Sequence, residues 1–415
     1  MTLRVPPAAE PSVSIVMVTY GAWHLAQTSL RAVVAHTPEP YEVIVVDNGS
    51  SDETVARLAE LEGAKVIFNP ENRGFGPASN QGAEAARGRN VVFLNSDAIV
   101  SAGWLGPLLE TLESAAWVGA VVPRFLHEDG SLQEAGALLG QDGTVLTYGD
   151  RDRPERLRYR FRRVVDFGGG ACMLVRRADF KAVGGFDPQY APAYYEDADL
   201  CFRLALHGRL TMYEPRAMVT HVRYGSGGLA RAAELSARNR AQFVSRWHEQ
   251  LRGRPATLER ASERDRLYAR DAQATERILV VDGAAATRGG EPPGASMVST
   301  LAAGWPRARI SWLIAGRSEE AFDLERWLGR GVELVDEPSA HWLAERPLFY
   351  DAVIDASSDD AGLRRQVRSS QPQAMLFDLN DLEPDVDLIG ARLADAGIPP
   401  SPATDPRFGV RSFGP

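Results

Sequence analysis

The sequence predicts a two-domain α/β protein whose first domain has a parallel sheet. Strand-sized apolar runs alternate with helix-sized amphipathic stretches from residue 13 onward, and the same alternation restarts near residue 277. The chain has 415 residues, more than a single hydrophobic core usually serves. Its content of 44% hydrophobic and 24% charged residues is typical of a packed globular protein.

The first region begins with regular βα units. We expect strands over 13–18, 42–46, 64–68 and 90–94, and helices over 24–35, 52–61 and 76–86. The second of these helices has a good start, because Ser50, Ser51 and Asp52 can accept hydrogen bonds from exposed backbone N–H groups. Such units place parallel strands side by side.

The pattern weakens between residues 124 and 167, where Gly, Asp and Arg accumulate as in long loops that cover a site. The basic run 156–163 is expected to be a solvated face or loop, with an anionic-ligand or membrane-surface role as the less favoured alternative. The pattern recovers in a strand over 171–176, a helix over 197–207, a strand over 216–221 and a basic amphipathic helix over 229–252.

These patterns define a first domain over 1–252, a charged linker over 253–276, a Rossmann-like α/β domain over 277–398 and an irregular, proline-rich tail over 399–415. Strands of the second domain are expected at 277–281, 310–315, 332–335, 352–356 and 374–377. The GlyGlyGluProProGly loop within 282–294 is predicted to be a plain turn, because it matches neither a dinucleotide fingerprint nor a P-loop.

Composition excludes several classes of protein. The formal net charge of -9 gives no general electrostatic case for nucleic acid, so no nucleic-acid partner is expected. Cys172 and Cys201 are the only cysteines, which supports neither a disulfide framework nor a cysteine metal site and predicts two buried thiols. No segment of the sequence reaches transmembrane length, which favours a cytoplasmic protein.

Acidic residues follow two of the apolar strands, where an open α/β sheet places its ligand crevice. Asp47 is predicted either to hydrogen-bond a nucleobase or ribose, or only to cap the next helix. Asp97 offers oxygen ligands that suit Mg²⁺ or Mn²⁺. His221 ends a later strand and is predicted to add an imidazole to the same ion, although a lone histidine is more often structural.

Glu196 and Asp197 are adjacent, so their side chains are expected to point in different directions. Asp197 begins a helical pattern that would hold it rigidly, and we predict it to be a catalytic base, with a helix cap as the alternative. Gly168, Gly169 and Gly170 precede a strand and either admit a sugar or form a flexible turn.

The order and wording of these motifs resemble the family 2 glycosyltransferases with the GT-A fold, over residues 12–250. The matching motifs are SIVMVTYG, VVDNGSSDET, NRGFGPASNQG, FLNSDAIV, GGGACMLVRR, GGFDPQY and YYEDADLCFRL, followed by His221. The resemblance implies a nucleotide-sugar-binding GT-A domain with a mixed, mainly parallel sheet. Asn95 stands where an aspartate is common in this family, and the resulting Asn-Ser-Asp is similar to that of rhamnosyltransferase-type members.

The resemblance also implies roles for individual residues. Asp47 would contact the nucleobase, Asp97 and His221 would bind a divalent metal (Mn²⁺ or Mg²⁺), and Asp197 would be the catalytic base. The predicted donor-binding set is Thr19, Tyr20, Asp47, Asn48, Asn80, Asn95 and Ser96, and the predicted sugar or acceptor loop contains Gly169, Gly170 and Glu196. The implied donor is a nucleoside diphosphate sugar carried by dTDP or UDP, and the implied acceptor is a glycan or a lipid-linked molecule at a membrane surface.

Processive members of the family carry a Gln-x-x-Arg-Trp motif, whereas Gln242, Arg246 and Trp247 are spaced with one extra residue here. This departure favours a non-processive enzyme. The second domain resembles the N-terminal half of a GT-B glycosyltransferase and is expected to serve docking, acceptor handling or homo-oligomerisation. The alternatives are a non-catalytic nucleotide-sugar or glycan-binding scaffold and, less favoured, a sugar nucleotidyltransferase, which would need a basic glycine-rich loop near the first strand.

Overall fold

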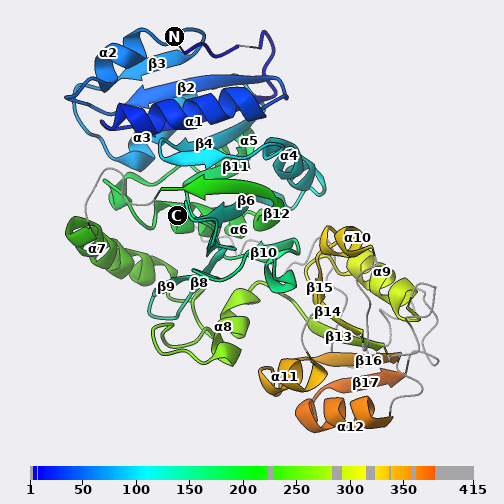
Figure 1. Cartoon of the computed structure of the whole chain (residues 1–415). Helices are drawn as coiled ribbons and strands as arrows, with labels where there is room; N and C mark the ends of the chain where they lie inside the picture. The colour runs from blue at the N-terminus through cyan, green and yellow to red at the C-terminus, as the bar shows by residue number, and fades with distance from the viewer. Residues whose placement is uncertain are drawn as a thin grey trace. The chain divides into compact units, whose positions relative to one another are not determined.

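The computed structural model describes residues 3–6, 8–222, 229–282, 292–314, 323–335, 338–356 and 361–378. The chain divides into two compact units, coloured from blue to green and from yellow to orange along most of their length in Figure 1. Among the described residues, unit 1 contains those up to 154 together with 165–259, and unit 2 contains 155–164 together with 260–378. Residues 283–291, which include the first half of the GlyGlyGluProProGly stretch, and the whole predicted tail at 399–415 lie outside the described residues.

Unit 1 is built on a ten-stranded sheet with the order β10-β12-β6-β11-β4-β1-β2-β3, to which β5 adds beside β12 and β7 beside β6. Its first strands are β1 (Val13–Thr19), β2 (Tyr41–Asp47), β3 (Lys65–Phe68), β4 (Asn90–Asn95) and β5 (Ala98–Val100). These first four pair in parallel, whereas β11 (Cys172–Arg176) runs antiparallel to both of its neighbours. The predicted α/β class with a mixed, mainly parallel sheet is therefore confirmed.

Helices flank this sheet because their apolar residues recur at helical spacing. In α1 (Trp23–His36), for example, Ala26, Leu30 and Val33 are buried along one stripe. The other helices of unit 1 are α2 (Thr54–Ala59), α3 (Phe75–Glu84), α4 (Leu105–Glu113), α5 (Arg177–Ala182), α6 (Glu196–Leu206) and α7 (Leu229–Trp247). No helix of the described residues is both long and apolar enough to cross a membrane.

The segment 124–167, expected to form long loops, instead contains several short strands. They are β6 (Val118–Leu126), β7 (Leu132–Glu134), β8 (Ala137–Leu139), β9 (Val145–Thr147) and β10 (Arg163–Val165), with a 3₁₀ turn, η1, at Leu157–Tyr159. Strands of three residues are too short to show an alternating pattern in the sequence. The strand β12 (Leu210–His221) is also longer than expected, because Pro215 lies at a register shift between Glu214 and Met218 where no ladder hydrogen bond is needed.

Unit 2 contains a five-stranded parallel sheet with the order β15-β14-β13-β16-β17. The strands are β13 (Arg277–Asp282), β14 (Arg309–Ile314), β15 (Val332–Leu334), β16 (Ala352–Ala356) and β17 (Met375–Asp378). One apolar core packs α9 (Ala295–Gly304) and α10 (Leu324–Leu328) on one face of this sheet. A second core packs α8 (Glu263–Arg270), α11 (Ser339–Ala344) and α12 (Ala361–Ser370) on the other face. Helices on both faces of a parallel sheet are typical of a doubly wound fold.

The basic run 156–163 is part of unit 2, so the prediction that it forms a solvated face or loop is wrong. Leu157 and Phe161 are buried in the core that contains α9. Arg158 is also buried, and its Nη2 lies 3.4 Å from Glu263 Oε1 and 3.3 Å from Glu345 Oε2. The run is therefore held in unit 2 by two buried apolar side chains and by the ion pairs of the Arg158 guanidinium.

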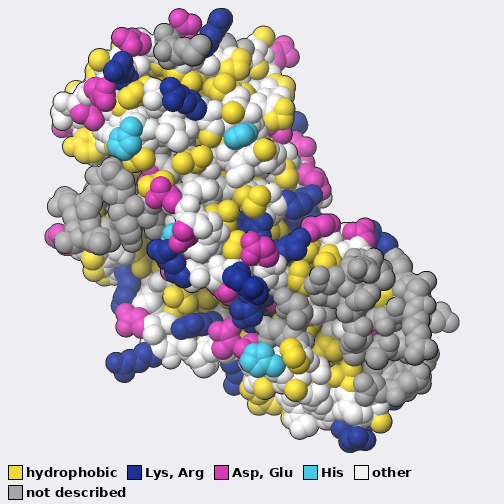
Figure 2. All heavy atoms as spheres, in the orientation of Figure 1, with side chains coloured by type: hydrophobic (Ala, Val, Ile, Leu, Met, Phe, Trp, Pro, Cys, Tyr) yellow, Lys and Arg dark blue, Asp and Glu magenta, His cyan; other side chains and the backbone are white. Residues whose placement is uncertain are grey.

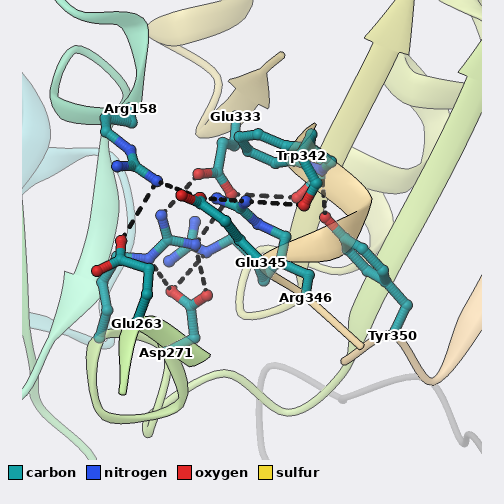
Figure 3. A network of polar contacts seen from close by, with 11 residues as sticks. Arg158, Glu263, Asp271, Glu333, Trp342, Glu345, Arg346 and Tyr350 are labelled. Atoms are coloured by element: carbon teal, nitrogen blue, oxygen red, sulfur yellow. Dashed lines mark hydrogen bonds and ion pairs between the residues drawn. The ribbon is translucent and has the colours of Figure 1, made fainter. Parts of the chain in front are cut away.

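Buried charges next to this run form a connected network (Figure 3). Arg270 Nη1 lies 2.6 Å from Glu333 Oε1, and Arg270 Nη2 lies 2.6 Å from Asp271 Oδ2. Arg309 Nε lies 2.8 Å from the other oxygen of Asp271. Burial alone would raise the pKa of Asp271, but the charges of Arg270 and Arg309 offset it and hold that pKa well below its usual range.

Both cysteines are free and buried, as the sequence predicts, and burial raises the pKa of the Cys201 thiol to about 12. On the face of the molecule seen in Figure 2, acidic and basic side chains of the described residues are intermixed.

Candidate functional site

The carboxyl ends of β1, β2 and β4 bring together several of the predicted site residues. Thr19 and Asp47 are direct partners in the register of β1 and β2, and Val18 is the partner of Asn95 on β4. Thr19 and Asp47 are buried, whereas Tyr20 is 48% exposed just beyond the strand end. This edge therefore offers a buried carboxylate beside an accessible aromatic ring.

The two loops that follow β1 and β2 are tied to each other by side-chain hydrogen bonds. Ser50 donates its hydroxyl to Asp47 and accepts a hydrogen bond of 2.7 Å from the backbone N–H of Gly21. Asp52 accepts from the N–H groups of Ala22 and Thr54, and its contacts with Thr54, followed by that with Ala22, lower the pKa of Asp52. Asp52, rather than Asp47, thus accepts a hydrogen bond from the first backbone N–H of α2, whose N-cap residue is Glu53.

Asn48 and Asn80 both use their side-chain amides to hold backbone loops. The amide nitrogen of Asn48 donates to the Asn72 side chain at 3.0 Å, and its oxygen accepts from the N–H of Arg73 at 3.1 Å. The amide of Asn80 both donates to and accepts from the backbone of Phe186, each at 2.8 Å. Direct contact of these two residues with a donor stays a prediction.

Asp97 and His221 come together at the next position along the sheet. Ser96 and Asp97 lie in the turn between β4 and β5, and β5 pairs with the end of β12 so that Ala98 is the partner of His221. Asp97 Oδ1 and His221 Nε2 are 3.4 Å apart, and the backbone oxygen of Asp97 accepts from the N–H of Val222 at 3.0 Å. Strand pairing therefore sets the distance between the two side chains.

A carboxylate and an imidazole at this distance fit a divalent cation. The described residues contain no group of three or more His, Cys, Asp and Glu side chains that could hold a metal. A pair of protein ligands leaves several coordination positions for phosphate oxygens and water, which is how Mg²⁺ is usually bound at phosphate sites. The carboxylate of Asp97 and the imidazole of His221 thus suit Mg²⁺ or Mn²⁺ that is also bound by a phosphorylated ligand.

Asp197 lies in the first turn of α6 and is held by backbone donors. One carboxylate oxygen accepts from the N–H of Gly170 at 2.9 Å, and the other accepts from the N–H of Ala198 at 2.8 Å. Burial nevertheless raises the pKa of Asp197 above its ordinary value. The result is a rigidly placed carboxylate with increased basicity.

The turn at Gly168, Gly169 and Gly170 packs closely on its surroundings. A Cβ atom at Gly168 would lie 2.6 Å from the Val122 side chain, which requires glycine there. Gly169 donates its N–H to Glu134 at 2.7 Å, and Gly170 donates to Asp197. The next residue, Ala171, accepts from the N–H of Asn95 at 2.8 Å. This turn therefore connects the Asp197 region with the end of β4.

Comparison with known proteins decides the family. Residues 14–184 match the family model described as "Glycosyl transferase family 2". The N-acetylglucosaminyl-diphospho-decaprenol L-rhamnosyltransferase of Mycobacterium tuberculosis is 30% identical over 254 residues, which cover 55% of this chain and 82% of that protein. The chain belongs to glycosyltransferase family 2. The predicted resemblance to rhamnosyltransferases is thus supported by a relative of that type. The likeness of unit 2 to half of a GT-B enzyme stays a prediction.

Other similar proteins differ more in length from this glycosyltransferase. The uncharacterized protein y4gI of Sinorhizobium fredii is 26% identical over 248 residues, which are 57% of this chain but only 27% of that protein. Among solved structures, GalNAc-T7 with UDP, GalNAc and Mn²⁺ matches with a TM-score of 0.46 and 18% identity over 57% of this chain and 48% of the other.

Two structural features of this family 2 glycosyltransferase had no signal in its sequence. Gln133, which is 2% exposed on β7, contacts His221 through both atoms of its amide. Its neighbour Glu134 accepts from Gly169. Contacts therefore run without a break from Asp97 through His221 and β7 to Gly169 and Asp197, although no periodic pattern marks Gln133 or Glu134 as site residues.

Glu196, predicted to lie in the sugar or acceptor loop, is buried beside Asp197. Its Oε2 has no hydrogen-bond partner among the residues that the structure describes. Burial, with a further contribution from the charge of Asp197, raises the pKa of Glu196 well above its ordinary value. The two preceding residues, Tyr194 and Tyr195, have φ values of 78° and 71°, which tyrosine rarely adopts. Strain of this kind is concentrated at functional sites.

Proposed function

We propose that this family 2 glycosyltransferase moves a hexose or deoxyhexose from a dTDP- or UDP-linked sugar to a hydroxyl of a glycan or lipid-linked acceptor. The reaction would proceed with inversion and add one sugar per encounter. The observation that carries the proposal is the continuous set of contacts that joins the Asp97–His221 pair to the buried carboxylate of Asp197. The rhamnosyltransferase relative supports a deoxyhexose and a lipid-linked acceptor.

Asp197 would act as the general base. It would take the proton of the acceptor hydroxyl while that oxygen forms a bond to the anomeric carbon. The bond from the anomeric carbon to the nucleoside diphosphate would break on the opposite face, and the diphosphate would leave with the electron pair. Such a single displacement inverts the configuration of the anomeric carbon. The raised pKa of Asp197, which results from burial, favours proton uptake.

The remaining residues would bind the donor. Tyr20 is exposed at the strand end and would stack on the nucleobase, while the neighbouring Asp47 carboxylate would accept hydrogen bonds from the base or the ribose. Asp97 and His221 would hold a divalent cation that, when bound, neutralises the charge of the departing diphosphate. Gly169 and Gly170 would leave room for the sugar beside Asp197. Unit 2 would serve acceptor handling, docking or oligomerisation.

The test is release of nucleoside diphosphate from a panel of dTDP-, UDP- and GDP-sugars with an acceptor extract, in Mn²⁺, Mg²⁺ or EDTA. We expect metal-dependent release that Asp97→Ala abolishes. Asp197→Asn should lower kcat by about 10²- to 10⁴-fold and leave donor affinity nearly unchanged. Asp129→Asn, in the exposed turn after β6, is the matched control and should behave like the wild type.

Two results would contradict this assignment. Loss of donor binding in Asp197→Asn would remove its role as the base, and full activity in EDTA would remove the metal. Donor binding without release in any condition would favour the alternative of a nucleotide-sugar-binding scaffold.

A further inference from the structure

We infer that Gln133 is the positioning residue that fixes the ring of His221 and leaves its Nε2 nitrogen free to bind the metal ion. The inference rests on the proposed function, because it concerns the metal site of that reaction. Gln133 touches neither Asp97 nor the site of transfer in any contact described above. It acts through His221, to which it is joined across 88 residues of sequence.

The orientation of the Gln133 amide follows from elementary hydrogen-bond chemistry. One of its terminal atoms lies 2.8 Å from the backbone oxygen of His221, and a carbonyl oxygen can only accept. That atom must therefore be the amide nitrogen, Nε2. The other terminal atom is then the oxygen, Oε1, which lies 2.9 Å from Nδ1 of His221.

The amide oxygen in turn dictates where His221 carries its proton. Because Oε1 of Gln133 can only accept, Nδ1 of His221 must donate. In the neutral ring the proton then lies on Nδ1, and Nε2 keeps its lone pair. That lone pair faces the Asp97 carboxylate oxygen at 3.4 Å. Two electron-pair donors facing each other at this distance are complementary to a cation.

A second histidine completes the arrangement on the other side of Gln133. The same amide nitrogen lies 3.2 Å from Nδ1 of His127, so this Nδ1 must accept, and the His127 proton lies on Nε2. That Nε2 donates to Asp150 Oδ1 at 2.8 Å. Each donor in this series of hydrogen bonds meets an acceptor. Rotating the Gln133 amide by half a turn would therefore break its contacts with both histidines.

Burial makes the arrangement costly to disturb. Gln133 is 2% exposed, and an amide that loses its partners there leaves polar atoms without compensation. Histidines that bind metals commonly donate their second ring N–H to an acceptor, and loss of that acceptor typically lowers metal affinity by about 10- to 100-fold. Gln133 supplies this acceptor for His221.

The experiment compares Gln133→Leu, which removes both amide atoms, with Gln133→Glu, which keeps an acceptor for Nδ1. Mn²⁺ is titrated alone and with saturating UDP or dTDP, using the electron paramagnetic resonance signal of free Mn²⁺. We expect Gln133→Leu to weaken Mn²⁺ binding by about 10- to 100-fold and Gln133→Glu to retain most of it. Gln371→Leu, which removes a buried amide from unit 2, is the matched control and should leave Mn²⁺ affinity unchanged.

A second measurement needs no metal. Long-range ¹H–¹⁵N spectra of ¹⁵N-histidine-labelled protein distinguish the two ring tautomers, and the chain has 7 histidines. We expect metal-free His221 to show the Nδ1–H tautomer in the wild type and in Gln133→Glu, and to lose that preference in Gln133→Leu.

The outcomes separate the inference from the proposed function. Unchanged Mn²⁺ affinity and an unchanged His221 tautomer in a folded Gln133→Leu protein would overturn the inference. Absence of Mn²⁺ binding in the wild type would instead overturn the proposed metal site, and the tautomer spectra would still decide whether Gln133 sets the His221 ring.

Discussion

Glu196 and Asp197 are neighbours whose carboxylates have different surroundings. Asp197 accepts hydrogen bonds from two backbone N–H groups, whereas Glu196 Oε2 has no hydrogen-bond partner within the described part of the chain. Burial raises the pKa of both residues. A raised pKa in the folded state means that ionisation at neutral pH costs stability. An ionised Glu196 is therefore unfavourable for the folded state, which is compatible with the predicted role of this residue in the sugar or acceptor loop.

The substitution Glu196→Gln should raise the melting temperature at pH 7 to 8, because it removes a buried charge. Each kcal/mol gained corresponds to about 2–4 °C for a domain of this size. The gain should shrink as the pH falls and vanish only below 4.5, the ordinary value for glutamate, because the wild-type side chain is then protonated in both the folded and the unfolded state. Thermal unfolding between pH 3 and 8 tests this, with Glu62→Gln at the surface as the control. A lower melting temperature at every pH would contradict it.

At this scale the sequence is informative where a residue ends a strand. Asp47, Asn95 and His221 each end a regular apolar run, so their positions at the sheet edge could be predicted. Gln133 and Glu134 could not, because a polar residue within a three-residue strand has the same sequence appearance whether it is buried or exposed. Their partners lie 88 and 35 residues away in the chain.

The helix α7 supports the strained loop in front of Glu196. The amide nitrogen of Asn239 lies within 2.9 Å of the backbone oxygens of Tyr190, Ala193 and Tyr194. Arg246, further along α7, pairs with Asp187 at 2.7 Å and with Asp199 at 3.2 Å. The Arg-Trp pair of the modified Gln-x-x-x-Arg-Trp motif thus anchors α7 to α6, since the Trp247 indole also donates to Asp199 at 2.9 Å.

Replacing Asn239 with Leu should loosen this loop while preserving the helix. We expect a loss of about 1–3 kcal/mol in stability, because buried carbonyls lose their donor. We also expect kcat to fall by about 10²-fold, because the adjoining carboxylates lose their fixed positions. Urea unfolding and steady-state kinetics measure the two effects. Gln242→Leu, an exposed amide on the same helix, is the control. Wild-type kcat in Asn239→Leu would show that α7 does not position the loop.

Elements with a clear period were predicted to within a few residues, as for α1, β4 and α6. The strands between 118 and 167 are not predictable from the sequence, because their stability comes from distant partners. The strand β6, for instance, pairs with β12 in a register that joins Val118 to Leu210. Pairing across such a separation leaves no local signal, since neither strand alternates strictly between buried and exposed residues.

At the level of the whole molecule, composition and the restart of the βα pattern indicated more than one domain, but not how the chain divides. The assignment of 155–164 to unit 2 depends on Arg158 finding carboxylates in distant sequence, among them Glu345, 187 residues away. A basic run without its acidic partners is indistinguishable from a solvated loop. The buried network around Arg270 supplies part of that missing context.

The substitution Arg270→Met should destabilise unit 2 by about 3–5 kcal/mol at neutral pH, because it leaves the Asp271 and Glu333 charges under-compensated. Burial would raise the pKa of Asp271 and of Glu333, but the charge of Arg270 outweighs it, so folding lowers both pKa values. Their stabilising contribution is therefore present above their ordinary values of 3.8 and 4.5 and is lost as the pH falls through and below them. The difference between variant and wild type should shrink over the same range.

Urea unfolding at several pH values tests this prediction, with the transition of unit 2 assigned by hydrogen exchange in β13 and β14. Arg260→Met, at an exposed arginine, is the control. A pH-independent difference between Arg270→Met and the wild type would show that the network does not stabilise through ionised carboxylates.

The assignment of residues 155–164 to unit 2 has a consequence for folding during synthesis. Leu157 and Phe161 are translated long before the strands that bury them, so these two side chains have no core to pack into until residues beyond 277 have been synthesised. A fragment that ends at residue 259 would keep Leu157 and Phe161 without the core that buries them, and a fragment that starts at residue 260 would lack two side chains of its own core. We therefore expect neither fragment to fold independently as it does within this chain.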